Sequence, residues 1–119
     1  MSNITTGLIA TLKDNTTGVG VYLDEIPETA DVPAIALYNV SYANDRVQSG
    51  KKTKNTSTWR LTVVDTVQNL QNTIDQILLI DNTSNDVFQR LFFELTLIEP
   101  KALSEPHKRA FIEIRAYPK

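Results

Sequence analysis

The fold is decided by residues 34–64, which read AIALYNVSY (34–42), ANDRVQSGKKTKNT (43–56) and STWRLTVV (57–64). The third segment alternates as a strand does, because Trp59, Leu61 and Val63 face one way while Thr58, Arg60 and Thr62 face the other. The middle segment is longer than the about 2–5 residues of an ordinary hairpin connection. It gathers positive charge around a single glycine, on Arg46, Lys51, Lys52 and Lys54. We therefore predict two strands of one sheet, joined by a long loop that carries part of the function.

Two further segments show helical periodicity. Residues 2–15 place four apolar side chains on one helical face, Ile4, Leu8, Ile9 and Leu12, and Gly18 follows as a residue that tolerates a left-handed helix end. Residues 67–80 carry a longer apolar stripe made of Val67, Leu70, Ile74, Ile77 and Leu78. Asp65 and Gln68 precede most of this stripe at the spacing of a capping box, so we predict that the second helix begins beside them.

The remaining apolar segments have the pattern of strands. Residues 19–23 form a short one, and 34–42 begins with apolar side chains on both faces. In 87–98, Leu91, Phe93, Leu95 and Leu97 alternate with Arg90, Phe92, Glu94, Thr96 and Ile98. In 109–117, Ala110, Ile112, Ile114 and Ala116 alternate with Phe111, Glu113, Arg115 and Tyr117. The sequence thus predicts five strands.

These elements together predict an α+β fold in a single domain spanning residues 1–119. The expected order is helix-strand-strand-strand-helix-strand-strand, with a single antiparallel or mixed sheet of about five strands and two helices on one face. A hydrophobic share of 41% and a charged share of 22% are sufficient for a folded core. The longest apolar run is too short for a membrane span, and the N-terminal residues lack the pattern of a secretory signal.

The sheet face away from the helices is both charged and aromatic. It would carry Arg60, Thr62, Glu94, Glu113 and Arg115 among Phe92, Ile98, Phe111 and Tyr117. A solvated sheet face with scattered apolar residues is one interpretation. A subunit interface is the other, because aromatic and arginine residues are enriched in interfaces. The candidate interface residues are Arg60, Phe92, Glu94, Phe111, Glu113 and Arg115, joined by Asp24, Glu25 and Glu28 of a polar loop.

No residue pattern predicts catalysis, a cofactor or a metal. The chain has no cysteine and one histidine, His107, with no nucleophile marked as its partner. The four acids of the 24–33 loop (DEIPETADVP) lack the spacing of a calcium loop, so a solvated acidic loop is the better interpretation. The four glycines are too scattered for a phosphate-binding loop. We therefore do not expect an enzyme.

The basic loop leaves three interpretations open. It is a solvated loop tip, a docking arm for an acidic protein partner, or a contact to a nucleic-acid backbone. A net charge of −2 argues against a protein that coats nucleic acid through its bulk charge. An acidic loop and a basic loop in one subunit also suit head-to-tail contacts between copies, which close into rings.

A family resemblance is carried by residues 18–41, GVGVYLDEIPETADVPAIALYNVS, and by residues 107–117, HKRAFIEIRAY. Together with the order of elements, these resemble the tail terminator (tail completion) proteins of long-tailed bacteriophages, the group around the phage lambda terminator. Members typically begin with a helix and a short strand. A polar loop then leads to a strand that here carries Pro33, Ile35, Val40 and Ser41.

The resemblance implies a structural protein of the virion, located at the head-proximal end of the tail and assembled in the host cytoplasm. It implies a homo-oligomeric ring, usually a hexamer, that caps the tail tube, ends its polymerisation and offers an attachment surface to the head or neck. Its partners would be the tail tube protein and a head or neck connector protein, with DNA passing through the lumen. The basic loop and the open sheet face would then be candidates for contacts with the tube, the lumen or neighbouring subunits.

Two other functions stay open from the residues. A head–tail adaptor or neck protein of similar size would bind on the portal side rather than at tube ends. A small nucleic-acid-binding α+β module would use the 46–54 segment, with an affinity that falls steeply as salt rises. The absence of aromatic residues within that segment counts against base stacking there.

Overall fold

The structure, a computed structural model, describes residues 2–40, 57–100 and 107–119. Within these ranges the chain forms α1 (Ser2–Asn15), β1 (Gly20–Leu23), β2 (Ala34–Asn39), β3 (Ser57–Thr66), α2 (Leu70–Leu78), β4 (Phe88–Ile98) and β5 (His107–Pro118). The predicted α+β class and the predicted order of elements are both confirmed. The strand predicted at 34–42 ends at Asn39; Val40 is described but lies outside the strand, and residues 41–42 lie outside the described ranges.

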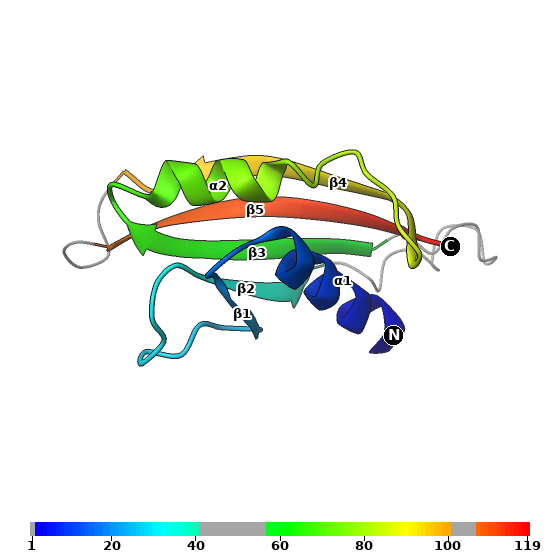
Figure 1. Cartoon of the computed structure of the whole chain (residues 1–119), viewed down its shortest axis with the longest axis horizontal. Helices are drawn as coiled ribbons and strands as arrows, with labels where there is room; N and C mark the ends of the chain where they lie inside the picture. The colour runs from blue at the N-terminus through cyan, green and yellow to red at the C-terminus, as the bar shows by residue number, and fades with distance from the viewer. Residues whose placement is uncertain (1, 41–56, 101–106) are drawn as a thin grey trace.

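The five strands form a single mixed sheet in the order β1-β2-β3-β5-β4 (Figure 1). β1 pairs with β2 in parallel, whereas the β2–β3, β3–β5 and β4–β5 pairs are antiparallel. β5 follows the other strands in the sequence but lies between β3 and β4. The sheet that the sequence left open as antiparallel or mixed is therefore mixed.

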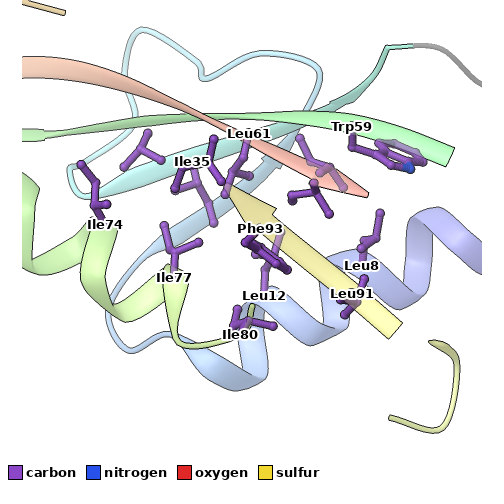
Figure 2. Close-up of a cluster of buried hydrophobic side chains, with 14 of the residues drawn as sticks. Leu8, Leu12, Ile35, Trp59, Leu61, Ile74, Ile77, Ile80, Leu91 and Phe93 are labelled. Atoms are coloured by element: carbon purple, nitrogen blue, oxygen red, sulfur yellow. The ribbon is translucent and has the colours of Figure 1, made fainter. Parts of the chain in front are cut away.

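Both helices cover the same face of the sheet (Figure 1). Leu8 and Leu12 of α1 and Ile74 and Ile77 of α2 are fully buried against the strands. Figure 2 shows these side chains gathered over Ile35, Leu61, Leu91 and Phe93, with Trp59 near one end of the cluster. Burying each such side chain contributes roughly 1.5–3 kcal/mol. This face supplies the core, so the other face is left for a different role.

The end of β4 departs from the predicted alternation. The β4–β5 register shifts between Leu95 and Leu97, which brings Leu97 opposite Phe111 and Ile98 opposite the buried Ala110. A single extra residue in one strand sends every later side chain to the opposite face. Assigning Ile98 to the open face was therefore wrong, because Ile98 packs against the core. Leu97, which the predicted alternation sets on the same side of the strand as Leu91, Phe93 and Leu95, lies 49% exposed on the open face.

The start of α2 also differs from the prediction. Asp65 lies within β3 and is buried, and α2 begins at Leu70 with Asn69 in the N-cap position. The Thr73 hydroxyl donates a hydrogen bond to Asp65 Oδ2 over 2.6 Å, and the backbone N–H of Thr66 donates to Oδ1 over 2.7 Å. Asp65 therefore fastens α2 to the end of β3 instead of capping the helix.

Candidate functional site: the open face of the sheet

The strands β2, β3, β5 and β4 present one face that neither helix covers, which we call the open face. Its register brings together in one row Tyr38, Arg60, Glu113 and Glu94, taken in order across the four strands. A second row contains Thr58, Arg115 and Phe92, and a third contains Ala36, Thr62, Phe111 and Leu97. All six predicted interface residues of the sheet therefore lie on one surface.

Arginine side chains lie over the aromatic rings of this face. The guanidinium carbons of Arg60 and Arg109 are 5.8 and 5.3 Å from the centroid of the Phe111 ring. Arg60 Nη1 also donates a hydrogen bond to the Tyr38 hydroxyl over 3.2 Å. Such cation–π contacts stabilise by about 0.5–1 kcal/mol at exposed sites. They hold the charges close to the sheet.

A second aromatic group occupies the β4–β5 side. The Arg115 guanidinium lies 5.8 Å from the Phe92 ring centroid. Phe92 and Tyr117 meet edge to face, with their centroids 5.8 Å apart and an interplanar angle of 87°. An arrangement of this kind suits a contact surface, because the rings offer apolar area that is already ordered before a partner arrives.

The two carboxylates of the central row have like-charged neighbours. Glu94 and Glu113 lie directly opposite each other in the β4–β5 ladder, where like charges destabilise a sheet. Glu113 also lies opposite Arg60, but these two side chains do not form an ion pair. Among the described residues, the ion pair joins Arg109 and Glu99. Arg109 Nε and Nη2 donate to the two carboxylate oxygens of Glu99, each over 3.0 Å. The central row thus keeps charge available for a partner.

The outer edge of β4 is closed along its first half by the segment that precedes it. The N–H of Asn82 donates to the Leu91 carbonyl over 2.7 Å, and the N–H of Leu91 donates to the Thr83 carbonyl over 2.8 Å. Further along, the Phe93 N–H donates to Asp81 Oδ1 over 2.8 Å. The register shift at Leu95–Leu97 then bends the second half. Covering and bulging are the usual ways to stop edge-to-edge strand addition.

The other edge of the sheet is short. β1 has four residues, and the turn after it ends the strand where Asp24 adopts a φ of +74°. The Leu23 carbonyl accepts a hydrogen bond from the N–H of Glu25 over 2.9 Å. Among the residues that the structure describes, neither edge therefore offers a long row of free backbone groups, and the open face is the larger exposed surface of the sheet.

The structure places the predicted acidic residues beside the edge strand β1. Asp24, Glu25 and Glu28 are exposed in the connection between β1 and β2, at the opposite side of the sheet from β4. In the described part of the chain, no group of three or more potential ligand side chains is arranged to bind a metal ion. The basic residues Arg46, Lys51, Lys52 and Lys54 lie outside the described residues. His107 is the first residue of β5 and is half-buried opposite Thr66.

Several residues of the open face were not among the predicted site residues. The alternation of 109–117 had placed Tyr117 on the same face as Arg115, but only the sheet register joins Tyr117 to Phe92 and Tyr38 to Arg60. The pairing of Arg109 with Glu99 also depends on a β4–β5 alignment that alternation alone does not provide. Leu97 was missed because of the bulge.

No protein-family model matches this chain, and no curated protein sequence matches it either. In the described residues, none of the helices has the length and apolar character needed to cross a membrane.

Proposed function

We propose that this chain is a structural protein of a bacteriophage virion, which forms a ring on the head-proximal end of the tail tube. The ring, a hexamer by resemblance, ends polymerisation of the tube and presents a surface to the head or neck connector. DNA passes through its lumen without sequence-specific binding. The family resemblance of residues 18–41 and 107–117 supports this function.

The structural observation that carries the proposal is the open face. A sheet whose edges are short or covered, but whose second face presents ordered aromatic and arginine side chains, is suited to assembly through that face. The contact surfaces of the ring would include Arg60, Phe92, Glu94, Phe111, Glu113 and Arg115. The exposed acids Asp24, Glu25 and Glu28 would meet positive charge on a neighbour, and the segment with Arg46, Lys51, Lys52 and Lys54 would face a partner or the lumen.

The test is assembly on tail tubes. Purified protein is added to polymerising tail tube protein, and tube lengths and tube ends are measured by electron microscopy, with mass measurement of any free ring. We expect rings at tube ends, an open central channel, and tubes that stop growing. Tubes that lengthen as they do without the protein would contradict the proposal. Binding to the portal side alone would indicate an adaptor role instead.

A further inference from the structure

The register of the open face has a self-complementary pattern that the proposed function does not require. The central row reads Tyr38, Arg60, Glu113 and Glu94 across β2, β3, β5 and β4. A two-fold axis that runs along the strands between β3 and β5 exchanges β3 with β5 of a second copy, and β2 with β4. Arg60 of each copy then lies over Glu113 of the other copy, and the Tyr38 hydroxyl of each copy lies over Glu94 of the other copy.

The row on one side matches large side chains with small ones. It reads Ala36, Thr62, Phe111 and Leu97 across the same four strands. The same axis sets Phe111 of each copy over Thr62 of the other, and it brings the half-exposed Leu97 toward β2 of the other copy, where Ala36 is already buried within its own chain. The row on the other side sets Thr58 over Arg115, and Phe92 over Val40, whose N–H bonds to the Thr58 carbonyl. Large and small side chains alternate in this way where two packed sheets interdigitate.

The charges and the edges both favour this occupant. Glu94 and Glu113 repel each other within one copy, and a second copy brings an arginine and a hydroxyl to that same pair. Arg60 is held on the face by Phe111 and Tyr38, so little side-chain freedom is lost when it meets a carboxylate. Because both edges of the sheet are short or covered, two copies meet more readily face to face than edge to edge.

We propose that two copies of this chain pair through their open faces about a two-fold axis, with reciprocal contacts between Arg60 and Glu113. This inference goes beyond the proposed function and does not rest on it. A paired copy cannot offer the same face to a tail tube or to a ring neighbour. The pair is therefore a reserve form, which has to separate before the protein caps a tube.

The experiment uses two charge-reversal variants. Each should pair weakly with itself, and the two should pair well with each other. Arg60→Glu sets two carboxylates against each other at both reciprocal contacts, and Glu113→Arg sets two guanidinium groups against each other. Each variant alone should pair about a hundredfold more weakly than the unmodified chain in sedimentation equilibrium. In an equimolar mixture, both contacts become complementary, and heterodimers should form with nearly the original affinity.

Mixing separates contact between copies from effects inside one copy, because Arg60 and Glu113 are also neighbours across β3 and β5. A charge conflict within one chain is not relieved by a second variant chain. Circular dichroism and thermal unfolding check that both variants fold. If either variant does not fold, Leu97→Glu is used instead. Leu97 is 49% exposed on the open face, so a glutamate there should weaken pairing without unfolding the chain.

Three results would overturn the inference: an unmodified chain that stays monomeric at every concentration reached, a single variant that pairs as well as the unmodified chain, or a mixture that stays monomeric. With the Leu97→Glu variant, undiminished pairing would do the same. None of these results bears on tube capping, which is measured separately with tail tube protein. A chain that caps tubes but never pairs would leave the proposed function standing without the reserve form.

Discussion

Asp65 shows how a single buried carboxylate joins two elements. It is 2% exposed, and it accepts hydrogen bonds from the Thr73 hydroxyl and the Thr66 N–H. In the described residues, every buried side-chain polar atom has a hydrogen-bond partner. Removing the side chain of Asp65 or of Thr73 would leave a buried polar atom of the other residue without its partner. The link between β3 and α2 therefore depends on both side chains.

We expect Asp65→Ala to lower the free energy of unfolding by about 1–3 kcal/mol, because it leaves the buried Thr73 hydroxyl without its acceptor. Chemical denaturation measures this loss. Thr73→Val should also destabilise the fold, and the double variant should cost less than the sum of the two single variants. Strict additivity would mean that the two side chains do not act as a pair.

Gly7 lies where α1 packs closely on the start of β4. A Cβ atom added there would lie 2.9 Å from Val87 Cγ1 and 3.2 Å from Cε2 of the fully buried Phe88. Helix propensity alone would favour alanine by about 0.8–1 kcal/mol. The steric conflict is the larger effect, because the valine side chain is stiff and the ring is enclosed.

We therefore expect Gly7→Ala to destabilise the protein by about 1–3 kcal/mol in thermal or chemical unfolding. Ala10→Gly, at an exposed position of the same helix, measures the propensity term by itself. Adding Val87→Ala to Gly7→Ala should recover part of the loss. A more stable Gly7→Ala variant would show that residues 87 and 88 move aside easily.

At the scale of elements, Asp81 completes the cover of the β4 edge. Its carboxylate accepts the Phe93 N–H at the point where the backbone pairing of the preceding segment ends. We expect Asp81→Ala to accelerate hydrogen exchange at the Phe93 amide while the amides of the β3–β5 ladder keep their protection. Asp86→Ala, at another exposed acid of the same connection, is the control. Unchanged exchange at Phe93 would mean that the edge is closed without Asp81.

The elements also show what alternation and periodicity can predict. Gly18 was expected to follow the end of α1, and it has a φ of +71° three residues after Asn15, the last residue of the helix. Trp59, Leu61 and Val63 were expected in the core and are buried there. These features depend on local backbone preference and on burial. Both follow from the type of each residue and its spacing along the chain, so the sequence alone predicts them.

The errors have a common physical origin. The bulge near Leu95 depends on how β4 meets β5, and the N-terminus of α2 depends on Asp65 being drawn into a strand. The partners of Arg60, Arg109 and Arg115 follow from strand order, because β5 enters between β3 and β4. Pairings of this kind join residues far apart in the sequence, so no local pattern reports them. Most residues of the open face were therefore predictable, with Leu97 and Ile98 as the exceptions, but their contacts were not.

At the scale of the whole molecule, the proposed pairing of two copies depends on charge contacts and on aromatic area. The salt dependence of pairing distinguishes these two contributions. The Debye length falls from about 10 Å at 0.1 M ionic strength to about 3 Å at 1 M. We expect the dissociation constant of the pair, measured by sedimentation, to rise several-fold over that range. Pairing that tightens with salt would indicate that apolar contact dominates and that the Arg60–Glu113 contacts contribute little.

The interior position of β5 has a consequence for synthesis. Residues 57–66 and 88–98 each need residues 107–118 as a ladder partner, and those residues come after both in the sequence. While the chain is growing, β3 and β4 have no shared partner, and their apolar faces lack a complete sheet. The β3–β5–β4 part of the sheet therefore forms only after β5 has been made, which places its long-range pairings late in folding.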